Sequence, residues 1–368
     1  MTIESMERLD FQKEVLDCVV GGLSVIDIPR LKIKSIEHAT DFIKTYGFDI
    51  ENPDEVEKLW HFHRRAVVLI TERLLKPGEQ IPELLTDRKL LGDIRLLLLH
   101  ASSEDEHDQE MQRWSCALLR VMHVFVHAEN DLFLSFSEEI QKQILTPFEK
   151  CVITDGTGTY LTSPGSQEKV KLVQFDWKPF KASASTAIKL LAKSDLIGMA
   201  IFDKVGVRFI TPTIFDSFKV IRFLVDHNLV SYPHIMPDQS SNTVYPADFF
   251  FEVMKEIESN PPDSAEQVSA YLNSKIDEKI KEARFVRKEN TFSSSGYRFI
   301  KFICRRLIQI PSSTGTGSHS PGKPLTFFYP FEVQIVDAES HQKNQEGEAA
   351  HASYKERQRE AARKRVLK

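Results

Sequence analysis

The sequence predicts an α+β fold, with a helical N-terminal domain followed by a domain that mixes strands and helices. Over the first 160 residues, apolar side chains recur at the spacing of amphipathic helices, in the runs 55–75, 88–100, 110–127 and 133–148. From Val170 onward, apolar runs typical of strands alternate with further helical patterns. The expected strands are 169–175, 200–210, 298–310 and 326–336, and the expected helices are 184–194, 214–228, 247–258 and 264–284.

Turn and cap residues place the boundaries of these elements. Asn52 and Thr86 precede helical patterns and are suitable helix starts. The Asp, Gly, Thr, Ser and Pro residues of 154–166 predict turns and the main domain boundary, and the loop 311–324 is expected to join two strands as a hairpin. We therefore expect a helical domain over 1–160, a second domain over 165–358 and a basic, frayed helical tail over 359–368.

Composition excludes several classes of protein. The 368 residues are 41% hydrophobic, which is enough for two domains or one large one with a real core. The 48 basic and 53 acidic residues nearly balance, so no field of one sign argues for binding to nucleic acid or membrane. The four cysteines lack C-x-x-C spacing, which argues against disulfides and a cysteine zinc site. Without a leader pattern or a long apolar run, a cytoplasmic protein is expected.

The segment 326–355 carries the most specific signal. Phe331, Val333 and Ile335 share one face of an expected strand, and Glu332 points to the other. The words FEVQI and, further on, GEAAHASYK resemble the closing motif of the RelA/SpoT family, EIQIRT followed by AExGxAAHWxYK. The synthetase domain of that family moves the β,γ-pyrophosphate of ATP onto the 3′-hydroxyl of a guanosine nucleotide. The resemblance implies that Glu332 is catalytic.

A second motif has the spacing K-x-x-x-S-x-x-x-K, formed by Lys181, Ser185 and Lys189. Residues four apart lie on one face of a helix, so the two ammonium groups and the hydroxyl could converge on a triphosphate. In the RelA/SpoT family this segment binds ATP, and Pro179 stands where the family has an arginine. The alternative for such a helix face, taken alone, is an ordinary solvated surface.

A third motif, DKVGVRFI from Asp203 to Ile210, resembles the family's DIxGVRVI strand. The resemblance implies that Asp203 is catalytic and holds Mg²⁺ together with Glu332, and that Arg208 lies near the ATP phosphates. Mg²⁺ prefers one or two carboxylates plus phosphate oxygens, as phosphoryl-type transfer requires. The alternative is a turn before a buried strand, with Arg208 as a surface cation.

A fourth motif, SGYRFIK, ends at Lys301 and resembles the family's NGYxSxH. It implies that Tyr297 stacks on the base of the acceptor nucleotide, with Lys301 and His351 also in the acceptor site. An aromatic ring at a loop-to-strand junction is a natural stacking surface. Lys301 stands where the family has a histidine, which keeps a cation there. The alternative for Tyr297 is an aromatic residue at the rim of the core.

The helical domain contains a partial match to the metal-binding HDxxED motif of the RelA/SpoT hydrolase domain. Ala101 follows His100 where that motif has its metal-binding aspartate, and a methyl group cannot bind a metal. His123 and His127 are four apart on an expected helix and could reach one ion. A hydrolase, another metal site and packed histidines all stay open, and we expect a regulatory or degenerate hydrolase-like domain that does not hydrolyse (p)ppGpp.

Four motifs in family order predict a RelA/SpoT-like nucleotidyltransferase domain, which implies a mixed sheet of about five strands flanked by helices. The expected function is an ATP-dependent pyrophosphokinase that uses Mg²⁺ and makes (p)ppGpp. One alternative acceptor is an adenosine nucleotide or the 3′ end of a tRNA. Another alternative is a nucleotide sensor that has lost turnover. Purine nucleotides are the expected partners, a membrane is not, and a homo-oligomer stays open.

Overall fold

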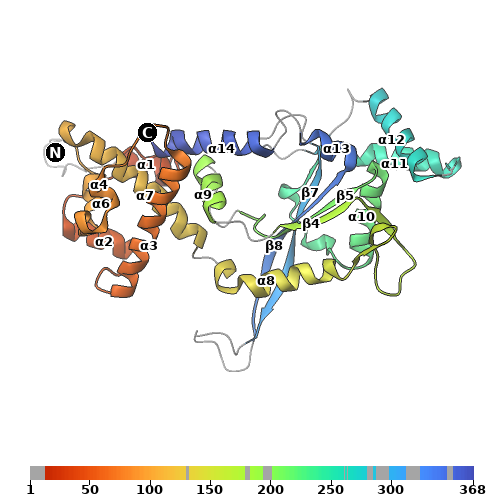
Figure 1. Cartoon of the computed structure of the whole chain (residues 1–368), viewed down its shortest axis with the longest axis horizontal. Helices are drawn as coiled ribbons and strands as arrows, with labels where there is room; N and C mark the ends of the chain where they lie inside the picture. The colour runs from red at the N-terminus through yellow and green to blue at the C-terminus, as the bar shows by residue number, and fades with distance from the viewer. Residues whose placement is uncertain are drawn as a thin grey trace, which may run out of the picture. The chain divides into compact units, whose positions relative to one another are not determined.

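The computed structural model describes residues 13–129, 132–178, 183–193, 201–260, 262, 264–279, 285–286, 298–311, 324–345 and 351–368. The chain forms two compact units. Unit 1 comprises Met1–Asn130, Ala182–Ala200 and Glu356–Lys368, and unit 2 comprises Asp131–Lys181 and Ile201–Lys355. The first part of the chain is helical and the second contains a mixed five-stranded sheet flanked by helices, which confirms the predicted α+β class (Figure 1). None of the described helices is long and apolar enough to cross a membrane.

Unit 1 is helical throughout its described residues. Its α-helices are α1 (Lys13–Val19), α2 (Ile36–Tyr46), α3 (Pro53–Leu69), α4 (Glu83–Thr86), α5 (Arg88–Leu91), α6 (Leu96–His100), α7 (Gln109–Glu129) and α9 (Ser183–Ala192). The part of α14 (His351–Val366) that begins at Glu356 also belongs to this unit. Two short 3-10 helices, η2 (Val25–Asp27) and η4 (Glu106–Asp108), and the π-helical turn η3 (Ile70–Leu74) complete it. The long helix α7 is central, since α3, α6 and α9 all pack against it. Its fully buried residues Leu118, Val121 and Phe125 form part of the unit's core.

The expected helix over 88–100 is wrong as a single element. The chain forms the short helices α5 and α6 instead, because Gly92 takes a left-handed φ of 70° and ends α5. Asp93 then accepts a hydrogen bond from the backbone N–H of Arg95 at 2.9 Å, which starts the next turn. The helix start expected at Asn52 is confirmed, since its side chain accepts from the N–H of Asp54.

The last residues of the chain differ from the expected frayed tail. They form the second half of α14, where Gln358, Ala362 and Val366 are buried on one face at four-residue spacing. Arg363 donates to both oxygens of Glu79 and to the carbonyl of Leu74. The basic side chains that suggested a solvated tail therefore have partners nearly three hundred residues away in sequence.

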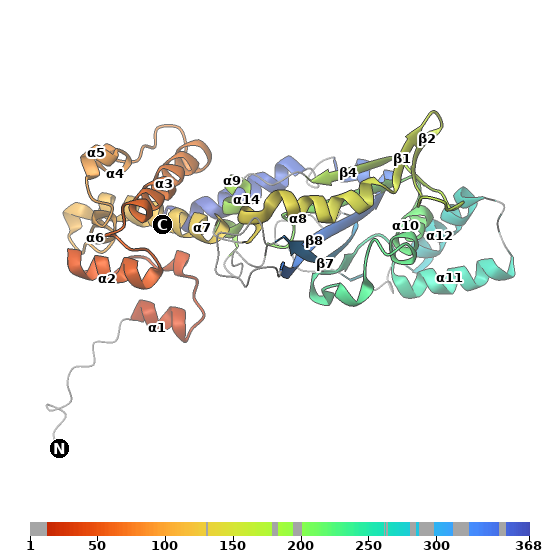
Figure 2. The same cartoon turned by 90° about the horizontal axis from the view of Figure 1, so that it is seen from below.

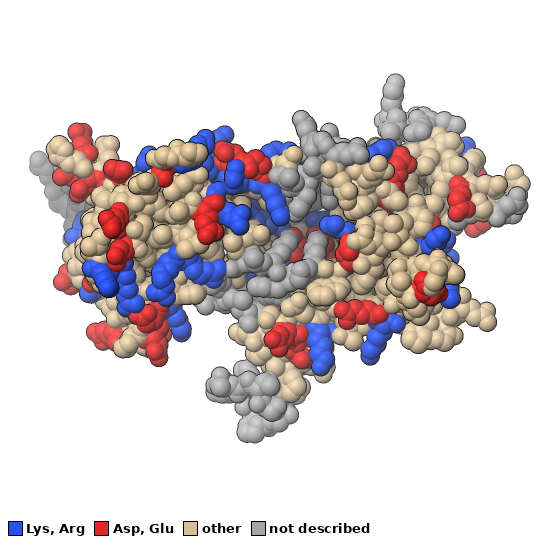
Figure 3. All heavy atoms as spheres, in the orientation of Figure 1, with Lys and Arg blue, Asp and Glu red and all other residues tan. Residues whose placement is uncertain are grey.

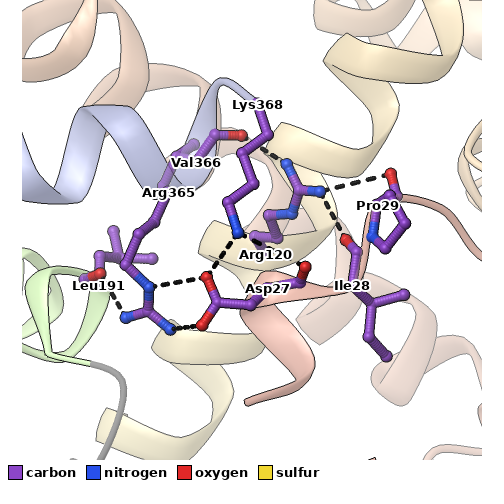
Figure 4. A network of polar contacts seen from close by, with 8 residues as sticks. All are labelled: Asp27, Ile28, Pro29, Arg120, Leu191, Arg365, Val366 and Lys368. Atoms are coloured by element: carbon purple, nitrogen blue, oxygen red, sulfur yellow. Dashed lines mark hydrogen bonds and ion pairs between the residues drawn. The ribbon is translucent and has the colours of Figure 1, made fainter. Parts of the chain in front are cut away.

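A polar network, which we call the C-terminal network, holds the end of α14 in unit 1 (Figure 4). Arg365 binds Asp27 with two hydrogen bonds, at 3.0 and 2.7 Å, and Lys368 reaches the same carboxylate at 2.8 Å. A third nitrogen of Arg365 donates to the carbonyl of Leu191 at the end of α9. The buried Arg120 of α7 donates to the carbonyls of Val366 and Ile28, both at 2.7 Å. Each charged group is thus matched by hydrogen bonds, as buried charge requires.

Unit 2 is built on a five-stranded sheet with the order β4-β5-β8-β7-β6. The strands of this sheet are β4 (Gln174–Lys178), β5 (Gly206–Thr211), β6 (Ser241–Asn242), β7 (Ile300–Ile310) and β8 (Leu325–Asp337). The central pair β5 and β8 is parallel and the other pairs are antiparallel. The helices are α8 (Leu132–Glu149), α10 (Ile214–Asp226), α11 (Ala247–Ser259), α12 (Ala265–Lys279), α13 (Ala338–Lys343) and the first turn of α14, with the 3-10 turns η6 (Tyr232–His234) and η7 (Pro237–Gln239).

One face of the sheet is the core of unit 2. Val207 and Phe209 of β5 and Phe331 and Val333 of β8 are buried there, together with residues of α8, α10, α11 and α12. Figures 1 and 2 show α8 and α10 beside the strands. Arg306 of β7 also lies on this face, where its guanidinium donates to the carbonyls of Gln143, Ile144 and Leu229. This half-buried cation is tolerated because three carbonyl oxygens accept its hydrogen bonds.

A small second sheet lies where the sequence predicts turns and a domain boundary. It consists of β1 (Val152–Asp155), β2 (Gly158–Leu161) and β3 (Val170–Leu172), all antiparallel. The two residues Gly156 and Thr157 join β1 and β2, and Gly158 directly after them takes a φ of 144° that favours glycine. The single strand expected over 169–175 is divided between two sheets. The compact units also do not divide here, since unit 2 already begins at Asp131 and includes α8.

Charged side chains of both signs alternate over the face of the molecule shown in Figure 3. This distribution agrees with the nearly equal totals of basic and acidic residues in the sequence. A charged binding site must therefore be formed by a local group of residues. The polar face of the main sheet contains such a group.

Candidate active site

Strand β8 separates an apolar face from a polar face of the sheet. Phe331, Val333 and Ile335 belong to the core, which confirms the predicted alternation. Glu332 and Gln334 point to the opposite face, yet they are only 4% and 6% exposed. Both faces of this part of β8 are therefore covered. A carboxylate in such a position requires charged or hydrogen-bonding neighbours.

A row of polar residues crosses this second face, one from each strand. Residues opposite one another on neighbouring strands point to the same face. The register pairs Asp176 with Arg208, Arg208 with Gln334, Gln334 with Lys301, and Lys301 with Ser241. The Arg208 Nε donates to Gln334 Oε1 at 2.9 Å, which fixes the direction of the guanidinium. We call this the polar row.

Glu332 lies one register step from the polar row. Its strand partner on β5 is Gly206, which has no side chain, and the Glu332 N–H donates to the carbonyl of Val205 at 2.9 Å. The Nζ of Lys301 is 3.7 Å from Glu332 Oε2. That distance allows electrostatic attraction but exceeds an ordinary N–H···O hydrogen bond. The Glu332 carboxylate is thus buried beside a cation and beside the start of β5.

Asp203 precedes β5 at the end where Glu332 lies. It is half-buried, and only Lys204 separates it from Val205, whose carbonyl binds the backbone of Glu332. Two carboxylates are therefore brought to one end of the parallel pair β5 and β8. Oxygen donors of this kind fit Mg²⁺, which needs one or two carboxylates when phosphates supply the other ligands. Among the described residues, no group of three or more His, Cys, Asp or Glu side chains could hold a metal by itself.

Lys204 adds a buried cation to this end of the sheet. Its residue is 5% exposed, and burial lowers the pKa of its ammonium to about 8. A low-dielectric surrounding disfavours the charged form of a lysine. An anionic group that bound nearby would favour the charged form again, because attraction then opposes the desolvation.

Helix α13 contributes a histidine to the edge of the polar row. Asp337 caps the helix by accepting from the N–H of Ser340 at 2.9 Å. Burial and the neighbouring Arg208 cation lower the pKa of His341, and Asp176 partly opposes this. Its Nε2 lies 2.8 Å from the side-chain nitrogen of Gln345. His341 is therefore held in place close to Arg208.

The structure brings four of the predicted site residues together in unit 2, namely Asp203, Arg208, Lys301 and Glu332. Ser185 and Lys189 lie on α9, which belongs to unit 1. Lys181 and Tyr297 lie outside the described residues, as does the side chain of His351, the first residue of α14.

Three residues of this region were not singled out by the sequence. Gln334 could have been found, because it is two residues from Glu332 on the same face of the strand. Lys204 follows Asp203 directly, but nothing in a lysine between an acid and a valine indicates burial. His341 reaches the row only through the turn from β8 into α13, which local patterns do not reveal.

The histidines of unit 1 form an aromatic group. The rings of His123 and His127 are 4.4 Å apart, and the hydroxyl of Tyr46 lies 2.7 Å from His123 Nδ1. Burial is the main cause that lowers the pKa of His123 to about 4, and the neighbouring His127 is the second cause. Ala101 is fully buried, and its carbonyl accepts from the N–H of Leu31. These contacts are those of packed side chains.

No protein-family model matches the sequence, and comparison with curated proteins finds no match.

Proposed function

We propose that the protein is an ATP-dependent pyrophosphokinase that transfers the β,γ-pyrophosphate of ATP to the 3′-hydroxyl of a guanosine nucleotide in the cytoplasm. The observation that carries this proposal is the placement of Asp203 and Glu332 at one end of β5 and β8, with Arg208 and Lys301 beside them. Two carboxylates among cations suit a reaction between a metal-bound polyphosphate and a hydroxyl group.

In this reaction Glu332 accepts the proton of the 3′-hydroxyl, or orients that hydroxyl. The 3′-oxygen of the acceptor forms a bond to the β-phosphorus of ATP. The bond between the β-phosphorus and the oxygen that bridges to the α-phosphate breaks, and AMP leaves with that oxygen. The products are AMP and a guanosine 3′-pyrophosphate. Asp203 and Glu332 would hold Mg²⁺, which offsets negative charge on the phosphates when bound.

The cations of the site have separate tasks. Arg208, oriented by Gln334, presents a planar guanidinium suited to phosphate oxygens. Lys301 belongs to the polar row and lies beside Glu332, where it attracts the acceptor's phosphates. The resemblance assigns the ATP triphosphate also to Lys181, Ser185 and Lys189, and the acceptor base to Tyr297.

The test is a transfer assay with several acceptors. Purified protein, radiolabelled ATP and Mg²⁺ are incubated with GDP, GTP, ADP, AMP or bulk tRNA, and the products are separated by thin-layer chromatography. We expect labelled product with GDP or GTP and none when Mg²⁺ is replaced by EDTA. Label on ADP, AMP or tRNA alone would show that the donor half of the proposal is right and the acceptor is wrong.

A nucleotide sensor without turnover is the second candidate. The observation in its favour is that Glu332 is 4% exposed and already has Lys301 as an ionic neighbour, as a structural carboxylate would. Binding of ATP and GDP by calorimetry, with no product in any assay, would favour the sensor. Failure to bind either nucleotide would contradict both candidates.

A further inference from the structure

Unit 1 contains an apolar cavity of about 140 Å³ that opens to the surface on one side. Helices α2, α3, α6 and α7 and the segment 25–31 line it, with side chains that include Ile43, Leu59, Leu98 and Val126. Natural protein interiors pack as densely as organic crystals and leave few voids larger than a water molecule. A cavity of this size is therefore unusual in a natural protein and indicates that a molecule binds in it.

Water is a poor occupant of this cavity. A buried water needs two to four polar partners. The polar groups of the lining are already engaged: Arg120 donates to the carbonyls of Val366 and Ile28, and the Cys116 thiol lies within hydrogen-bond reach of the carbonyls of Ala101 and Pro29. Arg30 pairs with Glu104, and Tyr46 with His123. The rest of the lining is a hydrocarbon surface, which favours an apolar guest.

The cavity has an apolar mouth with one polar pair. Val25, Phe42 and Tyr46 line it and are 45%, 39% and 39% exposed, so the lining reaches the surface at these residues. The hydroxyl of Tyr46 and the imidazole of His123, 2.7 Å apart, also belong to the lining. When the Tyr46 hydroxyl donates to His123, its oxygen keeps lone pairs that can accept a hydrogen bond from a guest.

The wall formed by the segment 25–31 is fixed in place. Asp27 is bound by Arg365 and Lys368, and the carbonyls of Ile28 and Pro29 accept from Arg120, as Figure 4 shows. Ile26 and Ile28, which line the cavity, are neighbours of these anchored atoms. The cavity is thus formed before a guest arrives, as in most small-molecule sites.

We propose that this cavity is a binding site for a small apolar molecule about the size of one aromatic ring that carries a hydroxyl group. The size follows from the volume, since an engineered apolar cavity of about 150 Å³ binds benzene. The hydroxyl follows from the Tyr46 and His123 pair at the mouth. This site is separate from the proposed chemistry and does not depend on it.

The first experiment uses toluene and p-cresol as probes on the full chain. Calorimetry and methyl-detected NMR of the wild-type protein should show one saturable site, with shifts concentrated on the methyl groups of Ile43, Leu59, Leu98 and Val126. Leu59→Phe fills the cavity and should abolish binding of both probes. The matched control Val68→Phe adds the same ring at an exposed position outside the lining and should leave binding unchanged.

The second experiment tests the polar pair. The double variant Tyr46→Phe with His123→Phe removes both hydrogen-bonding groups together, so neither is left unpaired. Toluene affinity should stay within about twofold, while the ratio of p-cresol to toluene affinity should fall roughly 2- to 12-fold, the value of one net hydrogen bond. Absence of saturable binding in the wild type, or equal binding in Leu59→Phe, would overturn the site. An unchanged ratio in the double variant would overturn the hydroxyl requirement.

Discussion

The protein contains two groups of buried charge that look alike in sequence and differ in geometry. In unit 1, Asp27 is bound by two nitrogens of Arg365 and by Lys368 at hydrogen-bond distance, and both side chains of the main pair are 13% exposed. In unit 2, Glu332 is 6% exposed at its side chain, and its ion pair with Lys301 spans 3.7 Å. The first pair has the short, two-point geometry of a structural ion pair, and the second does not.

This difference indicates that the Asp27 pair stabilises the fold and that Glu332 is the candidate for catalysis. A carboxylate bound at two points by arginine has its oxygens committed to the fold. The Glu332 carboxylate instead lies beside a lysine at 3.7 Å and beside Gly206 of the neighbouring strand, a setting that suits a metal ligand or a proton acceptor. We therefore expect variants of the C-terminal network to change stability, and variants around Glu332 to change turnover.

The largest effect is expected for Glu332→Gln. Glutamine keeps the shape and removes the charge, so the proton acceptor is lost and the single-turnover rate should fall roughly 10²- to 10⁴-fold. ATP binding should survive or tighten, because one negative charge near the phosphates has gone. Rapid-quench kinetics, calorimetry and thermal melting on the variant check this. Turnover within a few fold of wild type, with a lowered melting temperature, would make Glu332 a structural residue.

Asp27→Ala should have the next largest effect, on stability. It leaves Arg365 without its carboxylate, which for buried pairs costs about 3–5 kcal/mol, and roughly 2–4 kcal/mol is expected because the pair is slightly exposed. Urea denaturation measures the change. Glu104→Ala, which breaks the more exposed pair with Arg30, is the control and should change the midpoint little. A variant as stable as wild type would remove the structural role of the network.

Arg208→Lys should weaken the binding of ATP without affecting the fold. The ammonium keeps the charge and loses the planar fork, so the KM for ATP should rise about tenfold while the melting temperature stays the same. Arg222→Lys, at an exposed arginine of the same unit that pairs with Glu168, is the matched control and should stay within twofold. Equal effects of the two substitutions would show that Arg208 has no special contact with the nucleotide.

The smallest effect is a pH dependence that comes from Asp27. Burial alone would raise the pKa of this carboxyl, but its hydrogen bonds to Arg365 and Lys368 outweigh burial and lower the pKa below its usual range. The stability that Asp27 contributes is therefore complete above about pH 4 and is lost as the pH falls through the lowered pKa. The difference between the urea midpoints of wild type and Asp27→Asn, measured from pH 7 down to pH 3, should narrow as the pH falls below about 4. A constant difference would contradict the assignment.

Local patterns in the sequence were sufficient to predict the strands β7 and β8 and the two faces of β8. Apolar alternation around Glu332 depends only on neighbouring residues, and the hairpin that joins β7 and β8 follows from the turn residues between them. The helix expected over 88–100 is wrong because one glycine adopts a conformation that periodicity cannot show. Val173 likewise separates β3 from β4 within one apolar run.

Contacts between distant residues could not be predicted. The end of α14 is basic and resembles a solvated tail, yet Arg365 binds Asp27 at a separation of 338 residues. The candidate site has the same limit: the motifs indicated Asp203, Arg208, Lys301 and Glu332, but only the register of the sheet aligns Arg208 with Gln334 and Lys301. From the sequence, α9 was predicted to be part of the synthetase domain, whereas the structure groups it with unit 1.

The position of the label in the product tests the central claim most directly. ATP labelled separately at the α-, β- and γ-phosphorus is incubated with GDP, Mg²⁺ and either wild type or Glu332→Gln. Pyrophosphate transfer predicts that the β and γ labels reach the nucleotide product in equal amounts, that the α label stays in AMP, and that Glu332→Gln forms product at least about a hundredfold more slowly. Transfer of the γ label alone, transfer of the α label, or equal rates for the two proteins would contradict it.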